Sequence, residues 1–335
     1  MKVLEFSSQY LPTHGGDLDA ANVRFGLPER GWLDLSTGIN PIHYNFEELP
    51  PTVFTRLPDQ SLSETLIVAA KSYYRTSSAI VPGAGSQAFI RSLPNLFEPT
   101  EVAILAPTYS EHEKAWKQGG HSVSLVDNIE ALAQYQVAIV VNPNNPTGHA
   151  WPTNDLIKIG CDLEKKGGIL IVDEAFCDVQ PGISLAPILP IDGVVVLRSF
   201  GKFFGLAGIR LGFVLCSHEF AEQLSHSLGP WPVSGPALSI GAQALRDSEW
   251  HTQTRSRLTS DCARLDEIFE RFGNKVIGGT DLFRLIATDG RMLHEHLAQQ
   301  GIWTRVFHNN SNILRCGLPG NDADWCRLEA ALSVF

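Results

Sequence analysis

Residues 137–148 have the sequence VAIVVNPNNPTG, and this stretch indicates the fold. The apolar run at 137–141 is typical of a strand that is buried on both faces of a sheet. Two Asn-Pro steps follow it directly and predict a turn where that strand ends. Asn145 could present its side-chain amide to a ligand oxygen at this place, although a purely structural turn fits the same residues.

Comparable apolar runs recur on both sides of this stretch. Between most of them lie amphipathic or mixed stretches that are long enough for helices, such as 109–118 and 154–166. The alternation predicts an α/β fold with a mainly parallel sheet flanked by helices. The other expected strands are 79–81, 101–106, 168–172, 193–197 and 211–215.

The expected organisation has three parts. Residues 1–45 look irregular, with a turn at His14-Gly15-Gly16, and are expected to form an arm that packs with the smaller domain. A large domain is expected at 46–225, where Ser61 and Glu64 match a capping box that begins a helix. A smaller α+β domain is expected at 226–335. Its elements are a long helical region at 236–272, strands at 281–287, 302–307 and 312–316, a helix near 290–300 and a last helix.

Composition narrows the class of protein. The chain has 335 residues and a formal net charge of −10, which argues against a nucleic-acid partner. No apolar stretch approaches the roughly 20 residues that span a bilayer, and the first residues do not resemble a secretory signal. The six Cys contain no CxxC pair and are expected to be reduced thiols in a cytoplasmic protein. The eleven His show no metal-ligand spacing, so no metal is expected.

Two segments near strand ends could bind a phosphorylated ring. The stretch PGAGSQ at 82–87 lies between an expected strand and a helix, and backbone N–H groups at Gly85 and Ser86 could close on a phosphate. Small-residue turns of this kind also occur without a ligand. Tyr109, in APTY at 106–109, could stack on a flat ring, although an ordinary packed tyrosine fits equally well.

Two further segments carry charged groups. Asp173 ends the apolar run in IVDEAF at 171–176, where a buried carboxylate needs a positive partner such as a protonated pyridine nitrogen. Lys202, in SFGK at 199–202, lies among Phe and Gly and suits an amine that forms a Schiff base. Ser199 and Arg210 could add a hydroxyl and a cation to a bound phosphate. Together these groups match the protein partners of pyridoxal 5′-phosphate.

The motifs GAGSQ, APTY, NPNNPTG, IVDEAF, SFGK and GIRLG, in this order, resemble the fold-type I aminotransferase superfamily and its aspartate-aminotransferase-like fold. The resemblance covers nearly the whole chain from His14 onward. Within the superfamily, the chain resembles the histidinol-phosphate aminotransferase branch. Within that branch, residues 13–17 (THGGD) and 33–41 (LDLSTGINP) resemble the L-threonine-O-3-phosphate decarboxylases of cobalamin biosynthesis.

The resemblance implies roles for these residues. The large domain would bind the cofactor, with Lys202 as the Schiff-base amine and Tyr109 stacked on the ring. Asp173 would pair with the ring nitrogen and Asn145 with the ring O3′, while Gly85, Ser86, Ser199 and Arg210 would hold the phosphate. Arg315 would bind the substrate α-carboxylate. A homodimer is expected, because the family's cofactor site lies near the subunit interface.

Two positions depart from the family pattern. Phe176 stands where the family usually has a Tyr that donates to O3′, so O3′ would depend more on Asn145. Leu57 stands where the family often has a Tyr that reaches the partner subunit's cofactor phosphate, and a leucine cannot make that hydrogen bond.

The implied reaction is decarboxylation of L-threonine-O-3-phosphate to (R)-1-amino-2-propanol O-2-phosphate, with no nucleic-acid or membrane partner. His14, Arg305 and Arg315 are the candidate groups for the substrate, although Arg305 could be a solvated surface charge and His14 an ordinary loop residue. A histidinol-phosphate-type aminotransferase is the alternative, and a PLP-binding protein without catalysis is a weaker one.

Overall fold

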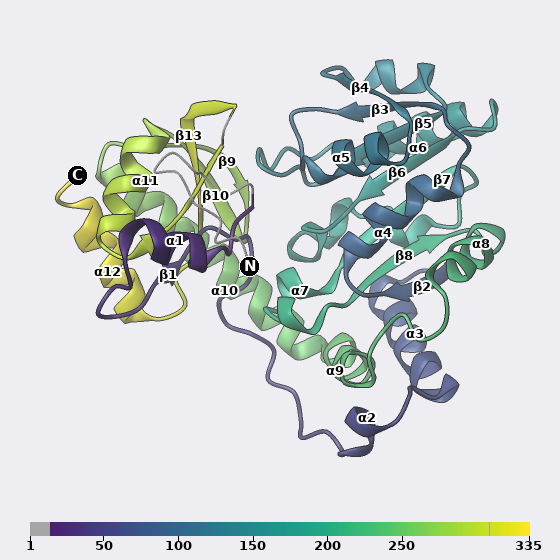
Figure 1. Cartoon of the computed structure of the whole chain (residues 1–335), viewed down its shortest axis with the longest axis horizontal. Coiled ribbons are helices and arrows are strands. Elements are labelled where there is room, and N and C mark those ends of the chain that lie inside the picture. Colours follow the sequence, from purple (N-terminus) through teal and green to yellow (C-terminus); the bar gives the residue numbers. More distant parts are fainter. Residues whose placement is uncertain (1–13, 308) are drawn as a thin grey trace, which may run out of the picture. The chain divides into compact units, whose positions relative to one another are not determined.

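The computed structural model describes residues 14–307 and 309–335. Contacts between residues divide the chain into two compact units (Figure 1). One unit is His43–Thr254, and the other combines the residues up to Ile42 with Arg255–Phe335. The sequence-based boundary near residue 225 lies before helix α9 (Gly235–Arg246). This helix makes its contacts with α3 (Gln60–Tyr74), which groups it with the large unit.

The large unit is built on a seven-stranded sheet with the strand order β2-β8-β7-β6-β5-β3-β4 (Figure 1). Strands β7, β6, β5, β3 and β4 are parallel, whereas β8 is antiparallel to both of its neighbours. The bounds are β2 Ala79–Gly83, β3 Glu101–Leu105, β4 Ser122–Val126, β5 Val137–Val141, β6 Ile169–Asp173, β7 Val194–Ser199 and β8 Gly212–Cys216. The predicted mainly parallel α/β sheet is therefore confirmed.

Continuous Val, Ile and Leu runs form the central strands because both faces of the sheet are covered by helices. Every residue of β5, β7 and β8 is buried. The helices that follow the strands are α4 Ser86–Ser92, α5 Glu111–Gln118, α6 Thr153–Glu164, α7 Phe200–Phe203 and α8 His218–Leu228, and α2 (Thr52–Thr55) precedes α3. Helix α3 begins at Gln60 with Asp59 as its N-cap residue, so the capping box expected at Ser61 is wrong. The Gln60 side chain instead donates to Glu64.

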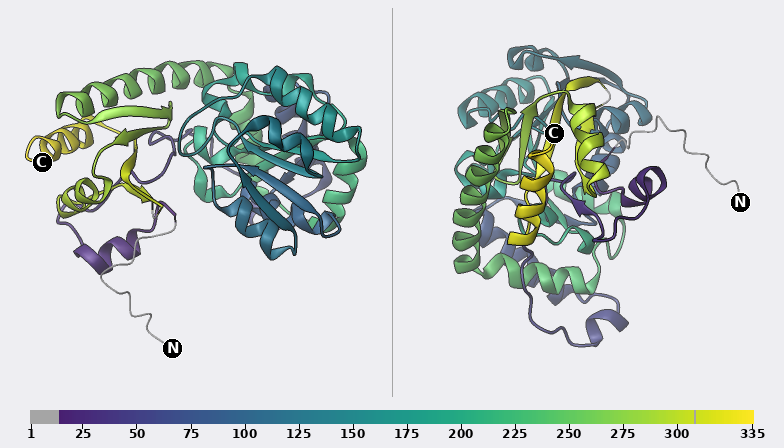
Figure 2. Two further views of the ribbon diagram at one scale, coloured as in Figure 1. Left: turned by 90° about the horizontal axis from the view of Figure 1, so that it is seen from above. Right: turned by 90° about the vertical axis from the view of Figure 1, so that its left-hand side faces the viewer.

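The smaller unit contains a four-stranded antiparallel sheet with the order β12-β13-β10-β9. Its elements are β9 Lys275–Thr280, β10 Phe283–Ala287, α11 Gly290–Gln299, β11 Ile302–Trp303, β12 Arg305–Phe307, β13 Asn310–Gly317 and α12 Asp322–Leu332. Helix α10 (Ser248–Arg271) lies along this sheet, as Figure 2 shows, and its Cys262 and Asp266 contact residues of β9 and β10. The expected helical region at 236–272 is thus two helices, α9 and α10.

The chain before residue 43 is more regular than expected. Residues Leu18–Phe25 form helix α1, which Asp17 caps, and Leu33–Asp34 form strand β1. Strand β1 pairs in parallel with β11, and Gly317 N–H donates to Leu35 O at 2.7 Å. These backbone hydrogen bonds hold the segment against the small sheet. Among the described residues of this segment, only the parts outside α1 and β1 are irregular, so the expectation of an irregular arm is corrected.

Candidate active site

Four predicted site residues lie at or just after the carboxyl ends of neighbouring parallel strands in the large unit. Tyr109 follows β3, Asn145 follows β5, Asp173 ends β6, and Lys202 lies in α7 directly after β7. Carboxyl ends of parallel strands meet at one edge of a sheet, and open α/β sheets bind ligands there. The connections of the fold thus bring these residues to one edge from segments far apart in the sequence.

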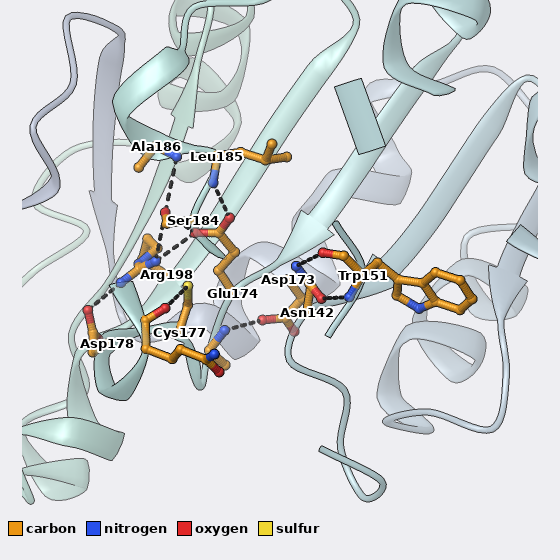
Figure 3. Close-up of polar contacts among 12 residues, drawn as sticks. Asn142, Trp151, Asp173, Glu174, Cys177, Asp178, Ser184, Leu185, Ala186 and Arg198 are labelled. Carbon is orange, nitrogen blue, oxygen red and sulfur yellow. Dashed lines mark hydrogen bonds and ion pairs between the residues drawn. The ribbon is translucent and has the colours of Figure 1, made fainter. Parts of the chain in front are cut away.

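Asp173 is a buried carboxylate that two donors hold in place. It is 3% exposed, and its Oδ1 accepts from the Ala175 N–H at 3.0 Å. Its Oδ2 lies 2.9 Å from Nε2 of His112 in α5, and the imidazole is the donor because a carboxylate oxygen only accepts. Asn142, at the end of β5, lies beside Asp173 and is fixed by Trp151 (Figure 3). A carboxylate held in this way suits a protonated pyridine nitrogen.

Lys202 lies over an aromatic ring from the loop that follows Asp173. Its Nζ is 5.1 Å from the centroid of the Phe176 ring. Phe200 and Phe203, which flank Lys202 in α7, are fully buried and anchor the short helix. The amine therefore lies close to the Asp173 loop, which is the arrangement that a cofactor bonded to Lys202 and paired with Asp173 requires.

The turn that the sequence predicts as a phosphate cradle lies where α4 begins. Gly85 has φ +81°, and a Cβ built on it would lie 2.9 Å from Nη2 of Arg210. A Cβ on Gly212 would lie 2.5 Å from the Ser86 nitrogen. The Arg210 guanidinium therefore lies close to Gly85, and the Ser86 N–H, the first of α4, lies close to Gly212. Ser199, which pairs with Gly212, ends β7 beside this turn, and the group of residues fits an anionic phosphate.

The loops that carry Tyr109 and Asn145 are tied together by a residue that the sequence did not single out. Asn144 Oδ1 accepts from Thr108 Oγ1 at 2.6 Å, and its Nδ2 donates to Pro107 O at 2.8 Å. Gln87 of α4 accepts from the Tyr109 hydroxyl at 3.2 Å and so orients the ring. Asn144, Gln87 and His112 were missed, and the only available signal was that each lies within the same motifs as a predicted residue or a few residues from one.

The three predicted substrate residues all belong to the smaller unit. Arg315 of β13 is directly opposite Arg305 of β12 and is buried, and its Nη2 donates to Ser36 O at 2.7 Å. The Gly16 N–H donates to the Ser36 hydroxyl at 2.7 Å, so Ser36 links Arg315 to the turn that follows the exposed His14. Thr13, in the same motif, lies outside the described residues.

Comparison with known proteins identifies the class. The family model for aminotransferase class I and II matches residues 48–331, and the chain belongs to this family. This confirms the predicted superfamily, and the family implies pyridoxal 5′-phosphate as the cofactor. Within the described residues, no helix is long and apolar enough to cross a membrane, and no cluster of His, Cys, Asp and Glu could hold a metal ion.

Individual relatives show which members of the family the chain is similar to. The chain is similar to threonine-phosphate decarboxylase from Pseudomonas aeruginosa, with 43% identity over 96% of this chain and 97% of that protein. It is 40% identical to threonine-phosphate decarboxylase from Sinorhizobium sp over 96% of this chain and 97% of that protein. A solved histidinol-phosphate aminotransferase from Sinorhizobium meliloti, in complex with pyridoxal-5′-phosphate, shares the fold with a TM-score of 0.79 at 20% identity, covering 98% of each chain.

Proposed function

We propose that this chain decarboxylates L-threonine-O-3-phosphate to (R)-1-amino-2-propanol O-2-phosphate, using pyridoxal 5′-phosphate, in cobalamin biosynthesis. The two threonine-phosphate decarboxylases support this proposal, because the similarity extends over 97% of the length of each. Histidinol-phosphate aminotransferases are also similar, but the one from Caldanaerobacter subterraneus is 26% identical, over 92% of this chain and 89% of that protein.

The observation that carries the proposal in the structure is the pair Arg305–Arg315. Directly opposite residues on antiparallel strands project from the same face of the sheet, so the two arginine side chains leave it from neighbouring positions. Threonine phosphate carries two anionic groups, a carboxylate and a phosphate, and each can bind one guanidinium. The buried Arg315, held by Ser36, suits the carboxylate, and the more accessible Arg305 suits the phosphate.

The residues of the large unit fit the cofactor. When bound, pyridoxal 5′-phosphate supplies an electron sink for the substrate bond that stands perpendicular to its ring. Lys202 would hold the cofactor through its amine and later return a proton to the substrate Cα. Asp173, held by His112, would keep the proton on the ring nitrogen, and Asn145 would donate to the ring oxygen. Tyr109 would stack on the ring, and the cradle at Gly85, Ser86, Ser199 and Arg210 would bind the phosphate.

The orientation in which the protein holds the substrate would select the reaction. Arg315 would set this geometry by fixing the carboxylate. The same orientation would hold the Cα–H bond away from the perpendicular and so suppress transamination.

Incubation of the purified protein with threonine phosphate tests the proposal. We expect CO2 release without transfer of the amino group to 2-oxoglutarate. Amino transfer without CO2 release would assign the chain to the histidinol-phosphate-type aminotransferases instead. A parallel incubation with histidinol phosphate and 2-oxoglutarate measures that activity directly.

A homodimer and a cytoplasmic location complete the proposal. Large apolar side chains are exposed near α2 of the large unit, among them Phe54 at 64% and Leu57 at 63%. Such exposure favours burial against a second copy. All six Cys are free, which suits a reducing compartment. Sedimentation of the purified protein measures the assembly, and a monomer at micromolar concentration would contradict the dimer.

A further inference from the structure

A buried network of charges lies next to the cofactor residues and takes no part in the roles proposed above. Arg198 of β7 donates through Nη1 to Glu174 Oε2 at 2.6 Å and through Nη2 to Asp178. The Ser184 hydroxyl donates to the same Glu174 oxygen at 2.5 Å. Figure 3 shows Arg198 between these partners. The three charged side chains are at most 2% exposed, and the Arg198 guanidinium also lies 4.6 Å from the centre of the Tyr74 ring.

The network adjoins the site through two strands. Glu174 directly follows Asp173, and its N–H continues the ladder by donating to Leu197 O at 2.9 Å. Arg198 directly precedes Ser199 in β7, and β6 pairs with β7 so that Asp173 is opposite Leu197. Because side chains alternate along a strand, Arg198 projects from the face opposite to that of Leu197 and Ser199. The network therefore lies behind the strands whose ends carry the cofactor groups.

The network also closes the loop that follows Asp173. The second Glu174 oxygen accepts from the Leu185 N–H at 2.7 Å, and Ser184 Oγ accepts from the Ala186 N–H at 3.1 Å. These contacts join the beginning of the loop to its middle, at residues 184–186. The closed loop presents two groups to the site: the Ala175 N–H, which donates to Asp173, and the Phe176 ring, which lies below Lys202.

Burial of so many charges needs an explanation beyond stability. Two carboxylates share one guanidinium, and burial raises the pKa of Glu174 although Arg198 opposes the shift. Well-packed apolar side chains of the same volume are often as stabilising as a buried ion network, or more so. Hydrogen-bonded charges accept fewer alternative arrangements than apolar contacts do, which is an advantage where a loop must hold one conformation.

We infer that Arg198, Glu174, Asp178 and Ser184 form a positioning network that fixes Asp173 and Phe176 against Lys202 from behind the sheet. The inference rests on the proposed cofactor roles of Asp173 and Lys202. None of the four touches the reacting atoms, so each acts through the loop. Loss of one contact would let the loop shift, change the hydrogen bond from Ala175 to Asp173, and alter how strongly the ring nitrogen keeps its proton.

Ser184→Ala and Asp178→Asn test the inference with small changes. Arg198 is left unchanged, because its removal would leave two buried carboxylates without their counter-charge and impair folding. Ser184→Thr keeps the hydroxyl and is the conservative variant. Leu224→Ala, in α8, is the matched control: Leu224 is fully buried in the same unit, so the variant lowers the melting temperature without touching the network. Leu224→Val replaces it if the drop in melting temperature is too large.

Three measurements separate positioning from stability: the pH midpoint of the holoprotein's visible absorption, the affinity of the apoprotein for pyridoxal 5′-phosphate, and kcat against KM. For Ser184→Ala and Asp178→Asn we expect the midpoint to move by about half a pH unit or more. We expect cofactor affinity to fall, and kcat to fall about 10-fold with KM nearly unchanged. Ser184→Thr is expected to restore all three, and the Leu224 variant to keep the wild-type midpoint.

Network variants that lose melting temperature as the Leu224 control does, but keep the midpoint, the affinity and kcat, would overturn the inference. A wild-type protein that shows no visible band reducible by borohydride onto Lys202 is a different result. It would remove the proposed cofactor role, and this inference with it.

Discussion

Arg305 of β12 and Arg315 of β13 are opposite each other in the antiparallel pair of the small sheet. Like charges in directly opposite positions destabilise a strand pair. A ligand with two anionic groups would place a negative charge beside each guanidinium. Arg315 is further ordered by its contact with Ser36 O and by the Phe283 ring, 5.0 Å away. We therefore propose that this pair receives the two anionic groups of the substrate.

Substitution of Arg305 tests this role. Arg305→Met keeps an apolar stem that can pack on Phe307, which lies 5.3 Å from the guanidinium, but removes the charge. We expect KM for threonine phosphate to rise about 10- to 100-fold, the cost of one charge-assisted contact, with a smaller effect on kcat. Unchanged KM would place the substrate phosphate elsewhere.

Substitution of Gly85 tests the cradle. In Gly85→Ala the new Cβ meets Arg210 at 2.9 Å and the residue must keep φ +81°, so we expect affinity for pyridoxal 5′-phosphate to fall at least about 10-fold. Gly229→Ala is the matched control, because Gly229 has φ +71° but no atom within 4 Å of the built Cβ. It carries similar backbone strain, about 1–3 kcal/mol, without the contact. Equal cofactor affinity in the two variants would contradict the cradle.

The sequence predicted the central strands well for a physical reason. Strands β5, β6 and β7 are buried on both faces, so their apolar runs are continuous and the bounds differ from the predicted ones by two residues at most. Strand β4 was missed because it is an edge strand, SVSLV, with polar residues and partial exposure. Helix α1 was missed although Asp17 caps it and Gly26 ends it, since eight residues between turn signals give a weak periodic pattern.

The residues of the candidate site also fall into those that the sequence could predict and those that it could not. Residues at strand ends, such as Asp173 and Lys202, could be predicted because the strand pattern places them. The residues that hold them could not, because His112 reaches Asp173 from another strand-helix connection, 61 positions away. Arg198 was hidden for the opposite reason: it lies within a strand that otherwise looks apolar, and its partners on the loop before β7 become visible only in three dimensions.

Substitution of His112 tests its support of Asp173. His112 is 1% exposed, so His112→Phe keeps most of the volume and removes the donor, whereas His112→Gln retains one. We expect kcat to fall about 10- to 100-fold in the Phe variant and less in the Gln variant. Weaker cofactor binding should accompany the loss. Equal kinetics in both variants, at the wild-type level, would show that the Ala175 N–H alone orients Asp173.

Acid should weaken the smaller unit through His294, whose Nδ1 lies 2.9 Å from Thr304 Oγ1. Burial, with smaller contributions from Arg24 and Arg305, lowers the pKa of His294 to about 4, from 6.5. Between these pH values the unfolded chain binds a proton that the folded chain does not, so this contribution to the free energy of unfolding is complete above about pH 6.5 and is lost as the pH falls toward 4. The loss should total about 3 kcal/mol.

Denaturant unfolding from pH 7 to 4 measures this loss. His294→Gln should flatten the dependence of the free energy of unfolding on pH, and His226→Gln, at an exposed position, should not. The same slope in all three proteins would assign the acid sensitivity to other groups.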